Sequence, residues 1–198
     1  MNPLETSFES RFSADAGNLA DLLTHAVVEI HSPRGGGAGI IWGGSGLVVT
    51  NAHCVPRGAP LRIESGGRKH SADVIAYSRD HDLALVHAPA VSGPPLELRD
   101  VRSLRPGEIV FAHGHPLGMS HSLTMGAIHG VATHPRTGEP RFVVADVRLA
   151  PGNSGGALVD ANGRLVGINS MVVGGLGVAI PAVIAQEFVA RATSRRAA

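Results

Sequence analysis

Most of the chain consists of short apolar runs separated by glycine, proline or charged residues. Such runs, repeated at short intervals, are typical of the strands of a β-barrel or β-sandwich. In the first half of the chain the pattern predicts strands over residues 27–30, 39–42, 46–51, 61–64, 73–77 and 83–87. In the second half it predicts strands over residues 109–112, 122–133, 142–147, 157–159, 165–169 and 178–180.

A segment rich in proline and glycine, residues 91–107, separates the two sets of strands. Because the two sets have the same number of strands, we expect an all-β fold of two six-stranded barrels with a cleft between them. The first barrel, with its entry helix, is expected within residues 18–100. The second barrel, with a closing helix, is expected within residues 101–198, and the two together form one domain.

Helical patterns occur only near the two ends of the chain. A short helix is predicted over residues 18–25, where an asparagine N-cap precedes three leucines on one face. A closing helix is predicted to begin at Pro181, since proline suits a first turn. Residues 1–17 are polar apart from Phe8 and Phe12, so we expect a loose tail. The alternative is an arm that docks on another subunit through these two rings.

Composition agrees with the strand pattern. The chain of 198 residues has 43% hydrophobic and only 17% charged residues, with 26 glycines. Many glycines and few charges favour strands with tight turns over long surface helices. The net charge of +1 provides no electrostatic attraction for nucleic acid. No apolar run is long enough to predict a membrane span.

The expected compartment is the cytoplasm. The first residues lack the basic segment and apolar run of a secretory signal. A periplasmic or secreted location is the alternative. The single cysteine, Cys54, excludes an internal disulfide and is expected to be a free, buried thiol.

The segment Pro151-Gly-Asn-Ser-Gly-Gly-Ala157 carries the strongest chemical signal. A serine hydroxyl becomes a nucleophile when a base removes its proton and backbone N–H groups stabilise the oxyanion that forms. Glycines on both sides of Ser154 allow the backbone to turn so that such N–H groups converge. A glycine-rich hairpin turn is the plain structural alternative, but the full string is more specific than that.

A histidine and an aspartate occur where such a serine would need them. His53 follows a predicted strand and can accept the serine proton, with a pKa near 6.5–7 if it is unperturbed. Asp82 directly precedes an apolar strand and can orient the imidazole, whereas Asp80 is expected to be a solvated turn residue. His53, Asp82 and Ser154 are therefore the expected catalytic residues.

The order of these three residues resembles that of the trypsin-like serine proteases. The strings around them are similar to those of the bacterial HtrA/Deg branch of that family. Further similar strings are Gly114-His-Pro-Leu-Gly118, Val166-Gly-Ile-Asn169 and Ala179-Ile-Pro181.

The resemblance implies a serine endopeptidase that acts on unfolded or damaged proteins without a cofactor. It implies an oxyanion hole formed by the backbone N–H groups of Gly152 and Ser154. It also implies that extended substrate pairs with a strand that contains Ile168, Asn169, Ser170 and Met171. Relatives commonly form homotrimers, which makes Phe8 and Phe12 candidates for subunit contacts.

The chain also departs from the pattern of this branch. Only 17 residues follow Pro181, so we expect the protease domain alone, without a PDZ domain. Arg148 lies six residues before Ser154, where relatives usually have a small or apolar residue at the specificity pocket. An inward Arg148 would favour an acidic residue before the cut, but a buried unpaired guanidinium is costly. An outward Arg148 would leave a preference for small or medium apolar residues.

Two further interpretations remain. The chain has 11 histidines, and His113, His115, His121, His129 and His134 suggest a zinc site; without a recognisable ligand set, however, we expect no metal. The second interpretation is a non-enzymatic or latent peptide-binding or chaperone module on the same fold. The presence of all three expected catalytic residues argues against it.

Overall fold

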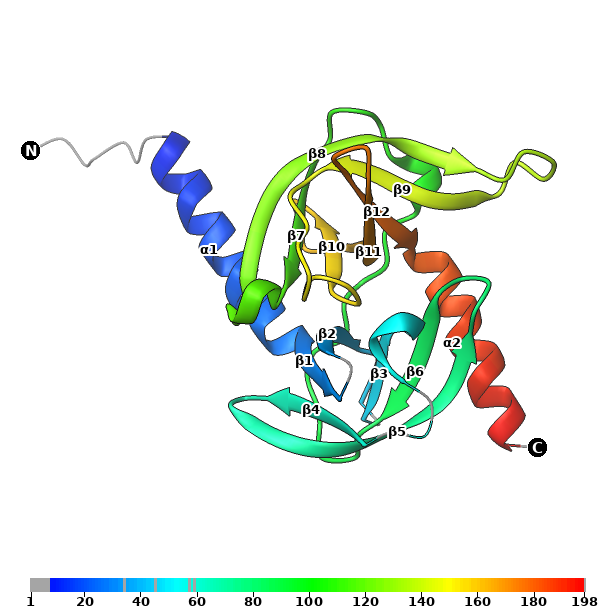
Figure 1. Ribbon diagram of the computed structural model, residues 1–198. Coiled ribbons are helices and arrows are strands. Elements are labelled where there is room, and N and C mark those ends of the chain that lie inside the picture. Colours follow the sequence, from blue (N-terminus) through cyan, green and yellow to red (C-terminus); the bar gives the residue numbers. More distant parts are fainter. Residues whose placement is uncertain (1–7, 34, 45, 57, 59, 198) are drawn as a thin grey trace, which may run out of the picture.

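The computed structural model describes residues 8–33, 35–44, 46–56, 58 and 60–197 (Figure 1). In this part of the chain, twelve strands form two closed barrels of six antiparallel strands each. The first barrel has the strand order β1-β2-β3-β6-β5-β4, and the second has the corresponding order β7-β8-β9-β12-β11-β10. The predicted fold class is confirmed.

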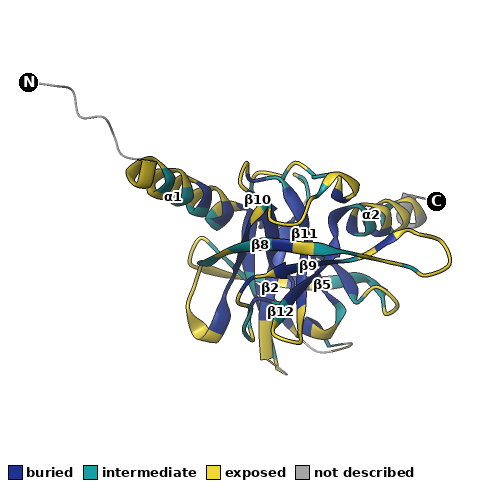
Figure 2. Cartoon of the chain, turned by 90° about the horizontal axis from the view of Figure 1, so that it is seen from above, coloured by how far each residue is buried: buried dark blue, intermediate teal, exposed yellow. Residues whose placement is uncertain are grey.

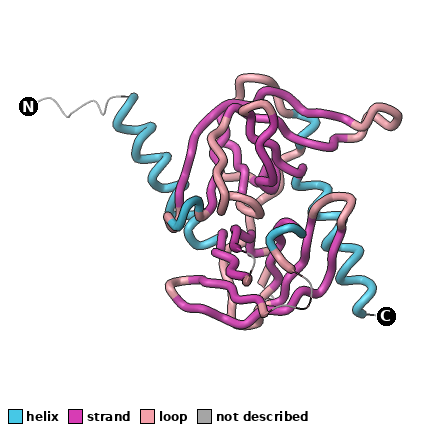
Figure 3. Tube along the Cα trace, viewed as in Figure 1, coloured by secondary structure: helices cyan, strands magenta, loops and turns pink. Residues whose placement is uncertain are grey.

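Figure 3 shows the second barrel above the first, with a helix at each end of the chain. The strands of the first barrel are β1 (Val27–Ser32), β2 (Gly35–Ile41), β3 (Leu47–Asn51), β4 (Leu61–Ser65), β5 (Arg68–Ser78) and β6 (Leu83–His87). The strands of the second barrel are β7 (Ile109–Gly114), β8 (Ser122–Thr133), β9 (Pro140–Asp146), β10 (Ala157–Asp160), β11 (Leu165–Val173) and β12 (Leu176–Pro181).

Several strands are buried on both faces, which Figure 2 shows as dark interior segments. In β6, Ala84 and Val86 belong to the apolar core of the first barrel. The alternate residues Leu83 and Leu85 belong to a core shared by both barrels and the two helices. A strand that is buried on both faces has a continuous apolar sequence. This is why β6 begins directly after Asp82 with an unbroken apolar run.

The first helix, α1 (Phe8–Ala26), is longer than predicted. Residues 8–17 are therefore helical rather than a loose tail, and residues 1–7 lie outside the described part. Leu19 and Leu23 are buried in the shared core, and Phe12 and Ala16 pack against it. These four residues follow helical spacing, so packing along one face stabilises the extra turns. The sequence pattern did not predict them because most of the other positions are polar and Gly17 disfavours a helix.

The second helix, α2 (Ala182–Ala197), begins directly after β12. Its buried residues, among them Ala185 and Phe188, pack into the shared core. An ion pair joins residues one turn apart on this helix, with Arg191 Nη1 3.5 Å from Glu187 Oε2. No helix in the described part of the chain is long and apolar enough to cross a membrane.

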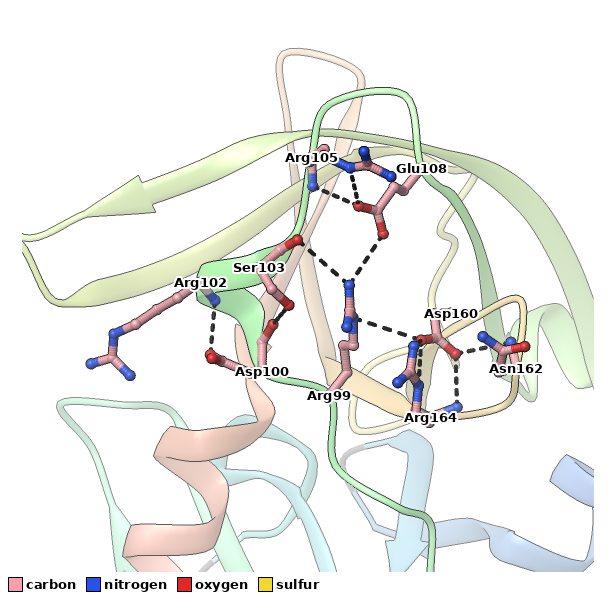
Figure 4. Close-up of polar contacts among 9 residues, drawn as sticks. All are labelled: Arg99, Asp100, Arg102, Ser103, Arg105, Glu108, Asp160, Asn162 and Arg164. Carbon is pink, nitrogen blue, oxygen red and sulfur yellow. Dashed lines mark hydrogen bonds and ion pairs between the residues drawn. The ribbon is translucent and has the colours of Figure 1, made fainter.

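The connection between the barrels is attached to the second barrel by a network of charged side chains (Figure 4). Arg99 lies between Glu108 and the buried Asp160, with distances of 3.6 Å (Nη2 to Glu108 Oε2) and 3.8 Å (Nε to Asp160 Oδ2). Arg164 Nη2 lies 2.7 Å from the same Asp160 oxygen. This network holds the connection where β7 begins. The predicted domain boundary at residue 100 falls in this connection.

Candidate active site

His53 lies in a short 3-10 turn, η1 (Ala52–Cys54), that directly follows β3. Its imidazole Nδ1 is 2.7 Å from Asp82 Oδ2, and its backbone N–H donates to Asp82 Oδ1 at 3.1 Å. The His53 side chain is 50% exposed, so a substrate can reach the other ring nitrogen. Both carboxylate oxygens of Asp82 thus orient the same residue.

Asp82 has a left-handed backbone conformation, with φ of 50°. Aspartate tolerates this conformation better than most residues. Its backbone N–H donates to Arg79 O at 3.2 Å, and its carbonyl accepts from Ala52 N and from Asn51 Nδ2, each at 3.0 Å. The turn before β6 is therefore tied to the turn after β3. Asp80, the competing acid, is exposed.

The pKa values of His53 and Asp82 shift in opposite directions. The hydrogen bond to Asp82, and after it the neighbouring Cys54, raises the pKa of His53 well above its ordinary value of 6.5. Burial raises the pKa of the Asp82 carboxyl, but hydrogen bonds from His53 and Ser170 more than offset this, so the net pKa is lowered. The pair therefore favours an ionised carboxylate beside a basic imidazole. A pKa of about 6.5–7 was expected from the sequence only for an unperturbed His53, and the contact with Asp82 means that this condition is not met.

Ser154 lies in the connection between β9 and β10, and backbone hydrogen bonds hold it from both sides. Its carbonyl accepts from Ala38 N of β2 at 2.8 Å, and Gly155 N donates to Asn169 O of β11 at 2.8 Å. Gly155 has a φ of +84°, and a Cβ at this position would collide with the Ala38 carbonyl. The close approach of the two barrels at this point therefore requires glycine.

The peptide bond between Pro151 and Gly152 is oriented by a second short turn, η3 (Pro116–Gly118). Leu117 N donates to Pro151 O at 3.1 Å, and His115 N donates to Gly152 O at 3.2 Å. In a trans peptide the C=O and N–H groups point in opposite directions. The Gly152 N–H group therefore points away from η3.

The N–H group of Ser154 is oriented in the same manner. Asn153 O, which belongs to the same peptide, accepts from Gly156 N at 3.0 Å. Within the described part of the chain, neither the Gly152 nor the Ser154 N–H group donates a hydrogen bond. Both remain available to an acceptor from outside the protein.

Ser170 connects the serine with the aspartate. Ser154 Oγ donates to the Ser170 carbonyl at 3.0 Å, and Ser170 Oγ donates to Asp82 Oδ2 at 3.2 Å. The described residues show no hydrogen bond between Ser154 Oγ and the His53 ring. The sequence analysis named Ser170 only as part of a substrate strand; its contact with Asp82 depends on how the two barrels meet.

A hollow of about 310 Å³ lies beside Ser154. Its walls are mostly apolar and include Leu149, Ala150, Pro151, Met171 and Val172. Arg148 is exposed and does not line this hollow, which differs from the inward orientation considered above. The physical reason is that an unpaired guanidinium is less costly in water than in an apolar pocket.

The two parts of β11, the strand expected to pair with substrate, differ in their contacts. Ile168 is fully buried and pairs with both Ala157 and Ile180. Asn169 is also buried, and its side-chain amide donates to the carbonyls of His113 and Ala157. The side chains of these two residues therefore belong to the core, and the expected pairing with substrate would involve only the backbone of this strand. The pairing with β10 ends at Ile168, so the edge from Ser170 onward is open.

The histidines considered as metal ligands separate into two groups. The rings of His113, His115 and His121 lie close together, with centroids between 4.7 and 6.2 Å apart. His129 is exposed on β8, and His134 lies in the β8–β9 hairpin. A different set, Glu29, His31 and Glu64, has the spacing of metal ligands. In the sequence, this set could have been identified from Glu29 and His31, which form a Glu-x-His pattern in a predicted strand.

Cys54 is free and buried, as predicted. Its Sγ lies 3.6 Å from the Ser154 carbonyl. It therefore packs between the turn that carries His53 and the loop that carries Ser154.

A family model described as a trypsin-like peptidase domain matches residues 37–168. The chain belongs to the trypsin-like peptidase family. The matched region contains His53, Asp82 and Ser154. The contacts described above among these three residues and their neighbours therefore lie within the region that the family model matches.

Relatives of this peptidase domain include members of the HtrA/Deg branch. Protease Do-like 1, chloroplastic, of Arabidopsis thaliana is 34% identical over 181 residues, which cover 83% of the chain and 41% of that relative. A probable periplasmic serine endoprotease DegP-like of Halomonas elongata is 35% identical over 159 residues, which cover 76% of the chain and 34% of that relative. The resemblance to this branch is confirmed.

A solved structure supports the same relationship. The HtrA-type protease AlgW with tripeptide matches with a TM-score of 0.77 at 29% identity, over 86% of this chain and 61% of that chain. The peptidase domain spans less than half the length of the two curated relatives. The similarity therefore concerns their peptidase region.

Proposed function

We propose that this chain is a serine endopeptidase in which Ser154 is the nucleophile, His53 the general base and Asp82 the residue that orients His53. The observation that carries the proposal is the double contact of Asp82 with His53, beside a serine whose loop is held by backbone hydrogen bonds. This arrangement has the parts that acyl transfer requires.

The reaction proceeds in two steps. Ser154 Oγ turns from the Ser170 carbonyl to His53 Nε2, which accepts its proton while Oγ bonds to the scissile carbonyl carbon. The C–N bond then breaks as His53 returns the proton to the leaving amine, and an ester on Ser154 remains. Water attacks this ester with its proton passing to His53, and the proton returns to Ser154 as the ester bond breaks.

The backbone N–H groups of Gly152 and Ser154 are the proposed oxyanion hole. Neither N–H group has an acceptor among the described residues, and their peptides are anchored through Pro151 O and Asn153 O. Preorganised donors of this kind stabilise the charge that develops on the carbonyl oxygen.

The proposed substrates are extended segments of unfolded or damaged proteins. The open edge of β11 from Ser170 onward can pair with such a segment. The hollow lined by Leu149 and Met171 suits a small or medium apolar side chain before the cut. Mapping of cleaved sites in a denatured protein mixture tests this, and a strict preference for acidic residues would contradict it.

One observation favours the alternative of a latent or purely peptide-binding module: Ser154 Oγ is bonded to Ser170 O rather than to His53. Covalent labelling by a fluorophosphonate separates the two hypotheses. The proposal requires labelling of the folded chain, and its absence under all assay conditions would support the alternative.

Replacement of the nucleophile is the direct test of the proposal. Ser154→Ala should lose both labelling and cleavage of a fluorescent casein, the latter by at least about 10⁴-fold. Ser92→Ala, at an exposed serine between the barrels, is the matched control and should retain both. Equal cleavage by the Ser154→Ala protein would refute the assignment.

We also propose a homotrimer formed through the first turns of α1. Phe8 is 75% exposed and stacks on Phe12 with ring centroids 6.2 Å apart, which leaves an apolar pair at the end of the helix. Figure 1 shows this end of the helix extending away from both barrels. Light scattering should give three times the chain mass of 20.4 kDa, and Phe8→Ser should reduce the mass. A monomeric parent would exclude the trimer.

The cytoplasm remains the proposed compartment. The relatives carry periplasmic, chloroplastic and mitochondrial names, so an exported location is the competing expectation. Fractionation of cells that produce the chain decides between the two.

A further inference from the structure

A second group of polar side chains lies outside the proposed catalytic residues, where β1 pairs with β4. Glu29 and His31 are two residues apart on β1, so their side chains point to the same face. Glu64 of β4 lies directly opposite Glu29 in the register of the two strands. One ligand atom from each of the three residues lies within 4.8 Å of the others.

The distances within this group suit a small cation. His31 Nε2 lies 3.1 Å from Glu64 Oε2 and 3.8 Å from Glu29 Oε1. Ligands of a tetrahedral zinc ion are separated by about 3.4 Å, since each lies about 2.1 Å from the metal. The three donor atoms therefore need only small rotations to bind one ion.

Charge also favours a cation at this position. The strand pairing places the carboxylates of Glu29 and Glu64 opposite each other, and such like-charged pairs destabilise a sheet. Lys69 of β5 has its Nζ 3.6 Å from Glu64 Oε2. Among the described residues, no lysine or arginine lies within 4 Å of the Glu29 carboxylate, whose ionic neighbours are the imidazoles of His31 and His115.

His115 borders this group from the second barrel. Its Nδ1 lies 3.9 Å from Glu29 Oε2, and its side chain is only 2% exposed. Nδ1 accepts a hydrogen bond from His121 N at 3.3 Å, whereas Nε2 has no hydrogen-bond partner in the described part of the chain. A buried imidazole with an unused nitrogen beside a carboxylate is uncommon in a core, where polar atoms are usually paired.

We propose that Glu29, His31 and Glu64 form a binding site for a divalent transition-metal ion, with Zn²⁺ as the ion that suits the ligand set best. One imidazole nitrogen and two carboxylate oxygens are donors that zinc accepts, and water completes the fourth position. Mg²⁺ and Ca²⁺ are disfavoured because they take oxygen ligands. The three side chains are between 24% and 33% exposed, so the ion reaches the site from solvent.

The position of this site connects the first barrel with the loop that orients Gly152. His115, which borders the site, donates its backbone N–H to the Gly152 carbonyl. A bound ion would therefore hold in place the surface of the first barrel that faces His115 and the loop containing it. The metal site does not depend on the proposed hydrolysis, because binding is measured without turnover.

Calorimetric titration of Zn²⁺ into the chelator-treated, complete chain tests the proposal. We expect one equivalent to bind, and Glu64→Gln and His31→Ala each to weaken binding by more than about 100-fold, since even outer contacts of metal sites contribute 10–100-fold. Co²⁺ provides a second readout, because its visible absorption reports ligation by His31 and the carboxylates. His129→Ala, at an exposed histidine outside the group, is the matched control and should bind normally.

Circular dichroism and thermal unfolding confirm that each variant is folded before its affinity is compared. Glu29→Gln, which preserves side-chain volume, replaces any variant that does not fold. Failure of the parent chain to bind Zn²⁺ would overturn the proposal. Binding that survives both His31→Ala and Glu64→Gln would also overturn it, since the ion would then lie elsewhere.

Discussion

The loop that carries His53 and the loop that carries Ser154 occupy the same position in two barrels of the same topology. His53 follows β3, the third strand of the first barrel, and Ser154 follows β9, the third strand of the second. The two residues are nevertheless held by different means. The carboxylate of Asp82 holds His53, whereas backbone hydrogen bonds from other segments hold the loop of Ser154.

This difference predicts which kind of substitution should disrupt each loop. The turn of His53 is also tied to the backbone of Asp82, but the imidazole itself is oriented by the Asp82 carboxylate, so a change of charge at Asp82 should be sufficient to disable it. The position of Ser154 depends on close backbone approaches, so an added Cβ at a glycine should be sufficient there.

The largest expected effect concerns the first barrel. Asp82→Asn should lower kcat by about 10⁴-fold, because an amide no longer selects the required tautomer of His53 or stabilises its protonated form. Hydrolysis of a fluorogenic peptide measures this loss. Asp80→Asn, at the exposed neighbouring acid, is the matched control and should retain full activity. Similar losses in both variants would contradict a special role for Asp82.

The same variant should change the titration of His53. Because Asp82 raises the pKa of His53, the parent rate should increase with pH through a pKa above 6.5, where the neutral imidazole forms. In Asp82→Asn the pKa should fall toward 6.5, as measured by NMR of the imidazole. An unchanged titration would show that the contact does not control the base.

In the second barrel, Gly152→Ala should lower kcat by about 10²–10³-fold, the usual cost of losing one oxyanion donor. A Cβ on Gly152 would collide with the His115 carbonyl, and its φ of +107° is rarely adopted by other residues. Gly130→Ala is the control, because no atom lies within 4 Å of a Cβ there. The same peptide assay applies, and full activity of Gly152→Ala would refute a backbone-held loop.

A smaller effect is expected where the two barrels meet. Ser170→Ala removes the hydrogen bond to Asp82 Oδ2 and should lower kcat about tenfold, because a bond to a charged group contributes about 1.5 kcal/mol. KM should be unchanged, since Ser170 Oγ acts through Asp82 rather than on substrate. Ser170→Thr, which retains the hydroxyl, should recover most of the rate. A change confined to KM would argue against this positioning role.

The last prediction concerns stability in acid rather than the rate. Burial, followed by the nearby His115 and His121, lowers the pKa of His113 to about 3. The unfolded chain takes up this proton near pH 6.5, so it binds more protons than the folded chain between these values, and stability falls as pH falls. His113 should contribute a loss of about 2 kcal/mol between pH 7 and pH 5.

Urea unfolding at a series of pH values measures this dependence. His113→Asn should flatten the dependence of the unfolding free energy on pH, whereas His129→Asn, at an exposed histidine, should not. In contrast, the pKa of His53 is raised, so its contribution to stability is present below pH 6.5 and is lost only at alkaline pH. Equal slopes for parent and His113→Asn would contradict the assignment.

Much of the fold and of the candidate site was predictable because the signals are local. Short apolar runs and the turns between them predicted the strands of both barrels, and the family strings identified His53, Asp82 and Ser154 as residues that should meet. Flanking glycines marked the loop of Ser154, since a backbone that must turn sharply needs them nearby in the sequence.

Other features depend on packing between distant segments. Residues 8–17 are polar at most positions, and only the apolar surface against which Phe12 packs makes them helical. Ile168 and Asn169 lie in a strand that is buried on both faces. The pattern of apolar and polar residues therefore could not distinguish core residues from residues that contact substrate. The orientation of Arg148 also depends on the folded structure, in which its side chain is exposed and does not line the hollow beside Ser154.

The sequence by itself indicated which residues are candidates for the chemistry and where the strands lie, because both depend on residue type over short stretches of the chain. The tertiary structure alone decided which strands become neighbours and in what register. Closure of the first barrel brings Glu64 opposite Glu29, and contact between the barrels brings Ser170 to Asp82. Such pairings join residues far apart in the chain, for which local pattern carries no information.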